Sequence, residues 1–535
     1  MTLYRKLELA FFVLSLSVAC ATSPAPPAPA PAPDPRDLDR AAVEALQSEL
    51  PLVLKAQGEA LWKSWTEAQL AGDSGLAERE SKLFTAEAVE AVARVAREAT
   101  DPREALGLRR LKLYLESVVL ARRSAEASEK VATILATATV GFDGYEVPFR
   151  DLEARLAAEA HAGQRRVLAR RAAPVLRRLE AALLARDAEE SRILRELGYE
   201  STGAFAVALR EVEPARLAAL AEEILSRTEE RYREAMAARA REESKLAFAD
   251  LRRADVPRLF RTGLVDSYFP KDRMRSSFES ALGAMGVGLE QVGVRLDAEP
   301  RPRKAPRALA MAVEVPGDVR LSIKPAAGLE PFAQALHEAG RAVALASVAE
   351  PSFELGYLGS SAPAQVIAEL FEGLVADPGF AAGLGVPEAR AAGHVRARAL
   401  KRLYDLRLEA ARLLCDVAWY GASADRRDVC RQAFGRAQGF PMDESDEGRW
   451  VFERRSTYAS ASRLAALVAA GQLEALLIER HGERWWADPR SGALIRKLLA
   501  SASAQSIDAW VSSWAGKGLD VALLLQRLEE RLRSE

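Results

Sequence analysis

A histidine and a glutamate stand side by side in the segment "ALHEAGRAVAL", Ala335 to Leu345. On a helix, residues four apart lie one turn apart on the same face. Two histidines at that spacing can share one zinc ion, and a glutamate directly after the first can activate the zinc-bound water. Here His337 and Glu338 are in place, but the position of the second histidine is Arg341. A guanidinium has no lone pair to donate and stays protonated, so Arg341 cannot ligate zinc and would repel it.

The elements around this motif can be predicted from the local pattern. In "PRALAMAVEVPGDVRLSIKP", residues 306–325, apolar residues alternate on both sides of a Pro-Gly-Asp turn, which predicts a β-hairpin. A helix returns at about Leu329 and carries His337. A loop rich in glycine and proline follows, and a second helix is predicted over 364–376.

Most of the remaining chain has a helical pattern. Apolar residues recur at three- and four-residue spacing from about Leu38 to Met236, and further helices are expected to about Arg533. Apolar residues make up 49% of the 535 residues, enough for a sizeable core. The fold class predicted is therefore mainly α, with one small β-hairpin or sheet near 306–325.

The charge balance argues against a nucleic-acid partner. The chain has 75 lysines and arginines against 76 aspartates and glutamates, a formal net charge of −1. Nucleic-acid-binding proteins usually show a basic excess. The many charged residues suit solvated helix faces instead.

The first residues have the pattern of an export signal. Arg5 and Lys6 precede an apolar run, Leu9 to Val18, that is too short to span a bilayer. "LSVAC" then ends at Cys20, which predicts a lipoprotein signal of residues 1–19 and acylation of Cys20. A plain secretory signal is the alternative, because Ser17 stands where lipoprotein signals usually have leucine.

Residues 20–37 read as the lipidated cysteine and a tether. "SPAPPAPAPAPDPRD" is proline-rich and semi-rigid, as expected of a spacer that holds a domain off a membrane. Ala21 gives no inner-membrane retention signal. We therefore expect a cell-envelope lipoprotein anchored in the outer membrane and facing the periplasm.

Two cysteines remain after Cys20. Cys415 and Cys430 can pair in an oxidising compartment, but Cys415 lies in an apolar helical pattern that favours a buried free thiol.

Several blocks together resemble a known family. "RPRKAPRALAMAVEVPGDVRLSIKPAAGLEPFAQALHEAGRA", "ELFEGLVADPGF" and "STYASASRLAALVAAGQ" occur in the order found in the all-helical gluzincins, the thimet oligopeptidase and oligoendopeptidase F group. The similarity runs from about Leu197 to the C-terminus, and more faintly from about Leu38. It implies a large helical fold with a deep cleft, divided into an N-terminal helical subdomain (38–200) and a gluzincin-like subdomain (201–535).

The resemblance also implies roles for single residues. His337 would be a zinc ligand, Glu338 the general base and Arg341 the replaced second ligand. The family's third ligand falls on Gln365, with Glu369 as the better carboxylate substitute and Glu372 one turn further on. Tyr458 falls where the family often has an oxyanion-stabilising tyrosine, although a core aromatic role fits it equally well.

Arg341 suggests what replaces the metal. Its guanidinium could pair with Glu338, three residues before it, or with Glu369 on the facing helix. Such pairing would keep the architecture without the zinc chemistry.

Three functions follow from this reading. The favoured one is a pseudo-metallopeptidase lipoprotein that has lost zinc hydrolysis, needs no cofactor and keeps its cleft for a peptide or partner protein, with the hairpin edge accepting an extended chain. The first alternative is an active zinc metallopeptidase that uses His337, Glu369 or Glu372, and a further ligand. The second is a structural or assembly lipoprotein of the envelope whose cleft is filled.

Overall fold

The computed structural model describes residues 34–69, 74–263, 265–421, 425–442, 444–446, 448–454 and 456–533. The expected signal, Cys20 and most of the tether therefore lie outside the described residues. The tether was expected to run to residue 37, but helix α1 already begins at Pro35. Asp34 caps it, since its carboxylate accepts a hydrogen bond from the Arg36 N–H at 2.9 Å.

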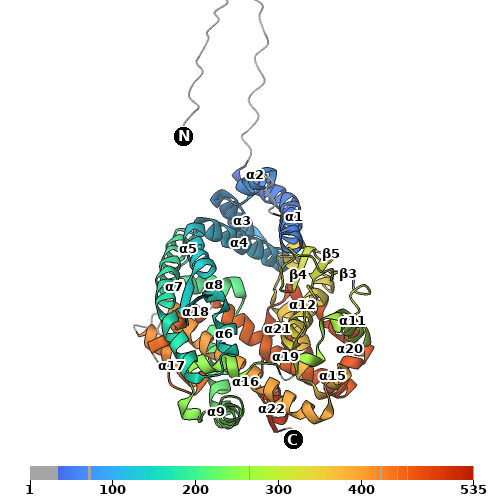
Figure 1. Cartoon of the computed structure of the whole chain (residues 1–535). Coiled ribbons are helices and arrows are strands. Elements are labelled where there is room, and N and C mark those ends of the chain that lie inside the picture. Colours follow the sequence, from blue (N-terminus) through green and yellow to red (C-terminus); the bar gives the residue numbers. More distant parts are fainter. Residues whose placement is uncertain are drawn as a thin grey trace, which may run out of the picture.

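The mainly helical class is confirmed, and the first helices form a layer of their own (Figure 1). Val43, Leu50, Leu111 and other apolar residues of these helices share one hydrophobic core, against which Phe353 and Tyr357 also pack. This layer therefore contacts the segment that follows the His337 helix. Its helices are α1 (Pro35–Glu67), α2 (Ser74–Leu83), α3 (Ala86–Glu98) and α4 (Pro102–Arg123). Helix α5 (Ala125–Thr137) follows, and its Val131 belongs to another, larger core.

A β-hairpin interrupts the N-terminal half, where the sequence pattern predicted helix throughout. Strand β1 (Thr139–Phe142) pairs antiparallel with β2 (Tyr145–Pro148). The turn is Asp143-Gly144, with φ of 50° and 80°. Two central residues at positive φ are what a tight hairpin turn requires, and Asp-Gly is a strong signal for it. The prediction of a single sheet is thus wrong, because this turn signal outweighs the helical pattern around it.

The following helices continue from this hairpin into a second, larger core. Val131, Leu168, Leu176 and Leu183 belong to the same core as residues near the C-terminus. The expected subdomain boundary at residue 200 therefore does not coincide with a change of core. The elements are α6 (Leu152–Ala158), α7 (Ala162–Glu196), α8 (Thr202–Arg210), α9 (Pro214–Ser244), α10 (Val256–Leu259) and α11 (Met274–Ala284).

The predicted hairpin at 306–325 is confirmed and carries a third strand. Strand β4 (Leu309–Glu314) pairs antiparallel with β5 (Asp318–Ser322), and β3 (Val294–Asp297) pairs parallel with β5, giving the order β3-β5-β4. Strand β4 is therefore an edge strand. The side chains of Val319 and Leu321 on β5 are fully buried and anchor the sheet on the core.

The C-terminal half is helical and surrounds one apolar helix. Helix α12 packs on α14, and α14 packs on α19. Helix α19 is long and apolar enough to cross a membrane, but 67% of its apolar window is buried inside the fold, as in a core helix. The elements are α12 (Leu329–Ala346), α13 (Phe353–Gly356), α14 (Ala362–Gly373), α15 (Pro378–Gly383), α16 (Glu388–Tyr420), α17 (Arg426–Gln438), α18 (Arg449–Glu453), α19 (Ala459–His481), α20 (Pro489–Leu499), α21 (Ile507–Ala515) and α22 (Ala522–Arg533).

Cys415 and Cys430 form a disulfide, with their Cα atoms 4.4 Å apart. Cys415 is fully buried, as the apolar pattern indicated, but the prediction of a free thiol is wrong. The reason is tertiary, because α16 and α17 pack side by side and bring the two sulfurs face to face.

Replacing both cysteines by alanine is expected to lower the free energy of unfolding by about 2 to 3 kcal/mol, because the bond closes a loop of 15 residues. Denaturant unfolding of the variant and the wild type measures the difference. Adding a reductant should lower the unfolding free energy of the wild type to that of the variant and leave the value for the variant unchanged. Equal unfolding free energies for the wild type, the reduced wild type and the variant would contradict this expectation.

Candidate functional site

Helices α12 and α14 approach each other so closely that only glycine fits at the contact. A Cβ on Gly340 would lie 2.5 Å from the backbone oxygen of Ile367 and 2.9 Å from Cα of Ala368. These distances are far shorter than carbon and oxygen contacts allow. The glycine of "HEAGR" therefore fixes the spacing of the two helices and sets His337 against the acidic residues of α14.

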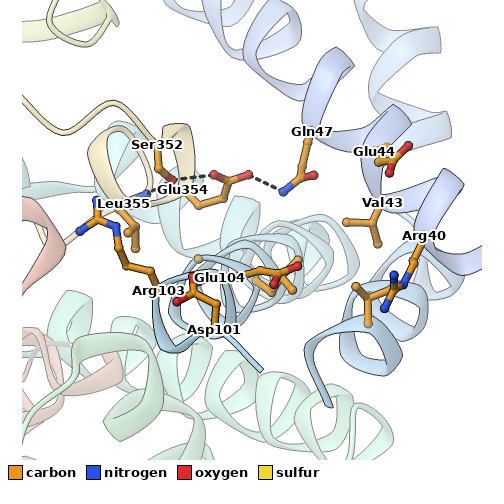
Figure 2. A pocket seen from close by; sticks show the side chains of 13 residues that line it. Arg40, Val43, Glu44, Gln47, Asp101, Arg103, Glu104, Ser352, Glu354 and Leu355 are labelled. Carbon is orange, nitrogen blue, oxygen red and sulfur yellow. Dashed lines mark hydrogen bonds between the residues drawn. The ribbon is translucent and has the colours of Figure 1, made fainter. Parts of the chain in front are cut away.

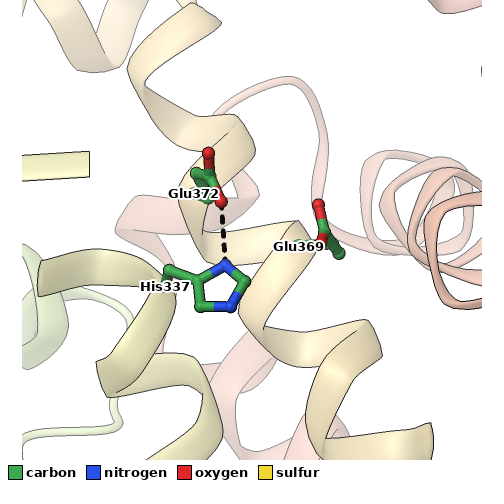
Figure 3. A group of neighbouring side chains, drawn as sticks. All are labelled: His337, Glu369 and Glu372. Carbon is green, nitrogen blue, oxygen red and sulfur yellow. Dashed lines mark hydrogen bonds and ion pairs between the residues drawn. The ribbon is translucent and has the colours of Figure 1, made fainter. Parts of the chain in front are cut away.

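His337 faces two glutamates of α14 (Figure 3). Its Nδ1 lies 2.8 Å from Oε2 of Glu372. One ligand atom each of His337, Glu369 and Glu372 lies within 4.8 Å of the others. The carboxylates nearest to His337 therefore come from another helix, and Glu372 belongs to this group together with Glu369.

His337 and Glu372 shift each other's pKa toward the charged forms. Burial alone would raise the pKa of Glu372, but the hydrogen bond and charge of His337 lower it to about 2. Burial alone would lower the pKa of His337, whereas Glu372, with smaller contributions from Glu369 and Glu338, raises it overall. The carboxylate of Glu372 thus favours the protonated imidazole.

Glu369 has two partners within the protein, one hydrogen-bond donor and one cation. Gln365 donates from Nε2 to Oε1 at 2.9 Å, and the guanidinium of Arg463 on α19 lies 3.3 Å from the same oxygen. Gln365, the expected third-ligand position, therefore serves as a hydrogen-bond donor to Glu369. A cation next to this carboxylate offsets its negative charge.

Glu338 points toward the sheet. Its Oε2 accepts a hydrogen bond of 2.8 Å from the Ala310 N–H of the edge strand β4, and its side chain is largely buried. The Ala312 carbonyl on the same strand accepts a long hydrogen bond from the Tyr357 hydroxyl, at 3.5 Å. Two groups on this strand edge thus already have partners, which leaves the strand-addition mode of peptide binding without support.

Arg341 pairs with one of its two expected partners. Its Nη1 lies 3.6 Å from Oε1 of Glu338, while its side chain is 39% exposed. Glu369 is paired with Arg463 instead. The hypothesis that Arg341 neutralises a carboxylate of the motif therefore agrees with the geometry at Glu338 and not at Glu369.

The zinc site implied by the family resemblance does not fit these residues. Arg341 stands in place of a ligand, and the amide of Gln365 donates a hydrogen bond where a lone pair would be required. His337, Glu369 and Glu372 offer another donor set, but Glu372 is bonded to His337 and Glu369 to Arg463. A metal ion at this place would have to break both pairs and lie beside a guanidinium.

Tyr458 lies at the start of α19 among buried aromatic and acidic groups. Its ring packs edge-on against Tyr420, with centroids 5.0 Å apart, and its side chain is buried. Burial, assisted by the nearby Asp416, raises the pKa of Tyr458 to about 12. Asp416 itself is fully buried and accepts a hydrogen bond from Ser460. This arrangement is that of a packed aromatic core.

A cavity of about 350 Å³ lies between α1, α4 and α13 (Figure 2). Glu354 faces it and accepts hydrogen bonds from Gln47 and from Ser352, each at 2.8 Å. Both acidic and basic side chains line the cavity, including Glu104 and Arg40, and the acidic ones outnumber the basic ones. No histidine or cysteine is among the described residues that line it.

A different cavity, of about 320 Å³, lies beside the motif helix and is lined by three arginines, Arg210, Arg341 and Arg463. Sequence reasoning missed Arg210 and Arg463. For Arg463 a signal exists, because a cation within the apolar stretch "SRLAALVAAG" of a core helix calls for a buried counter-charge. Arg210 ends a short helix, and only the fold brings it to the motif.

No protein-family model matches this chain, and the comparison with curated proteins finds no match. The resemblance to the gluzincins therefore rests on the sequence blocks themselves.

Proposed function

We propose that this chain is an envelope-tethered binding protein with a gluzincin-like helical fold, which has lost zinc hydrolysis and binds a peptide or a segment of a partner protein beside α12, α14 and α19. The observation that carries the proposal is the replacement of metal-binding groups by cations and amides. Arg341 and Gln365 occupy the expected ligand positions, and Arg463 lies 3.3 Å from Glu369.

The chemistry of these side chains suits recognition. General-base hydrolysis at zinc requires a carboxylate beside an activated water. Here Glu338 bonds the backbone of β4, and the remaining acidic groups are paired. Guanidinium groups that line a cavity favour anionic and polar ligands without any bond being broken.

The proposal predicts peptide binding without turnover. Mixed short peptides should bind the full chain with the same affinity before and after treatment with a chelator, and no cleavage product should form. Binding is measured by isothermal titration calorimetry and cleavage by mass spectrometry. Peptide cleavage that stops when the chelator is added would contradict the proposal.

A blocking variant locates the binding site. Ser361 is exposed, lines the cavity that Arg210, Arg341 and Arg463 also line, and makes no capping hydrogen bond. Tryptophan can therefore be placed there without disturbing the core. Ser361→Trp should abolish peptide binding, whereas Ala125→Trp on the exposed face of α5 should not. Absence of peptide binding in the wild type would favour the assembly lipoprotein whose cleft is filled.

Metal binding is the second candidate, and the convergence of His337, Glu369 and Glu372 is the observation that favours it. It predicts stoichiometric zinc in the purified protein and its loss in His337→Ala and in Glu369→Gln. Our proposal predicts substoichiometric zinc that neither substitution changes. Elemental analysis of the three proteins separates the two functions.

A further inference from the structure

The cavity beside the motif helix, which we call the arginine pocket, is lined by positively charged side chains. It is lined by Arg210, Arg341 and Arg463, and no aspartate or glutamate is among the described residues that line it. These arginines come from α8, α12 and α19, which are far apart in the sequence. Their convergence is thus a product of the fold.

The guanidinium groups retain hydrogen-bond donors for a ligand. Arg341 forms an ion pair with Glu338 at 3.6 Å. Arg463 forms ion pairs with Glu369 at 3.3 Å and with Glu409 at 3.8 Å, but neither arginine donates a hydrogen bond to a described residue. Arg210 donates to the backbone oxygen of Thr457 at 3.2 Å and, weakly, to its hydroxyl at 3.5 Å. Among the described residues it has no carboxylate partner. Each arginine carries five N–H groups, so most of these donors lack a protein acceptor.

Among the described residues, the wall of the pocket is otherwise polar or apolar but uncharged. Ser503 lines it and is only 6% exposed. Helix α14 also begins at the pocket, and its first turn adds partial positive charge.

The pKa of Arg210 agrees with its lack of a carboxylate partner among the described residues. Burial lowers this pKa, Tyr420 opposes the shift, and no carboxylate is among its causes. By contrast, the carboxylates of Glu369 and Glu409 outweigh burial and raise the pKa of Arg463. An anion bound in the pocket would stabilise the charged form of Arg210, as Glu369 stabilises the charged form of Arg463.

We propose that the arginine pocket binds a carboxylate, and that this carboxylate is the C-terminal one of a bound peptide. A planar carboxylate matches the paired N–H groups of a guanidinium. Apolar residues such as Leu345, Val348 and Leu499 line the rest of the pocket and suit the side chain of a terminal residue. A volume of about 320 Å³ is at the lower end of ligand sites and suits one or two residues.

This inference rests on the proposed function, and its test separates the two. The full chain is titrated with acetyl-Ala-Leu, its C-terminal amide, acetyl-Asp-amide and inorganic phosphate. Acetyl-Ala-Leu should bind, and the amide should bind at least about tenfold more weakly, because charged hydrogen bonds are lost. Tighter binding of acetyl-Asp-amide than of acetyl-Ala-Leu would overturn the assignment to a C-terminus.

Substitutions of the pocket arginines test their contribution to peptide binding. Arg341→Gln and Arg210→Gln should each weaken binding of acetyl-Ala-Leu about tenfold or more, and Arg341→Lys should weaken it less. Arg241→Gln, on an exposed face of α9, is the matched control and should bind as the wild type does.

The outcomes distinguish failure of the carboxylate inference from failure of the proposed function. Equal binding of the acid and the amide would overturn the carboxylate inference and leave peptide binding intact. Binding of phosphate that depends on Arg341, without binding of either peptide, would overturn the proposed function and support an anion pocket. Wild-type affinity in both Arg341→Gln and Arg210→Gln would overturn the assignment of the pocket.

Discussion

Replacing Gly340 by alanine is expected to destabilise the protein by at least about 3 kcal/mol, because the new methyl group would collide with the backbone of α14. The added Cβ would lie 2.5 Å from the carbonyl oxygen of Ile367. Backbone atoms cannot rotate away as a side chain can, so the two helices must separate. Urea unfolding followed by circular dichroism measures the loss of free energy of unfolding.

Gly393 provides a matched control within another helix. It lies in α16, where an added Cβ would meet nothing within 4 Å. Gly393→Ala should therefore stabilise the protein by about 0.5 to 1 kcal/mol, which is the ordinary gain of alanine over glycine in a helix. If both variants gained stability, the close approach of α12 and α14 would be refuted.

A second large effect is expected at Asp416. Burial raises the pKa of Asp416 to about 7, although the hydrogen bond from Ser460 and the charge of Arg454 act to lower it. In the unfolded chain the group titrates near its ordinary value of 3.8. The folded protein therefore holds a proton that the unfolded chain releases, and the contribution to stability falls as the pH rises from about 4 to about 7.

Asp416→Asn should remove this pH dependence. The amide stays neutral and its oxygen can still accept from Ser460. Between about pH 5 and about pH 8 the wild type should lose about 3 kcal/mol relative to the variant, since one unit of pKa shift corresponds to about 1.4 kcal/mol. Unfolding free energies of both proteins at the two pH values give this difference. Parallel curves for the two proteins would show that Asp416 is already ionised in the fold.

The sequence predicted those elements whose signals are local. The hairpin at 306–325 follows from alternation around its Pro-Gly-Asp turn, and the helix from Leu329 follows from apolar spacing. The same kind of local signal, Asp143-Gly144, is present at β1–β2, although the pattern on both sides of it predicts helix. Strand β3 could not be predicted in this way, because its partner β5 is parallel and over 20 residues away.

The candidate site likewise has some features that follow from the sequence and others that depend on the fold. Residue types along one helix revealed that His337 and Glu338 stand beside a cation instead of a second histidine. Which carboxylate pairs with which cation depends on neighbours from other helices, so Arg463, and not Arg341, lies against Glu369. Glu372, one turn past Glu369, meets His337 because Gly340 lets α14 approach.

The sequence by itself thus determined the helical class and the residue types of the motif, with arginine at position 341, since these depend on periodicity and on the identity of single side chains. Only the tertiary structure decided the pairing of Cys415 with Cys430, the partners of each glutamate and the meeting of Arg210, Arg341 and Arg463 around one cavity. The physical reason is that these contacts join residues distant in the chain. Their geometry is set by the packing of whole helices, which no local pattern encodes.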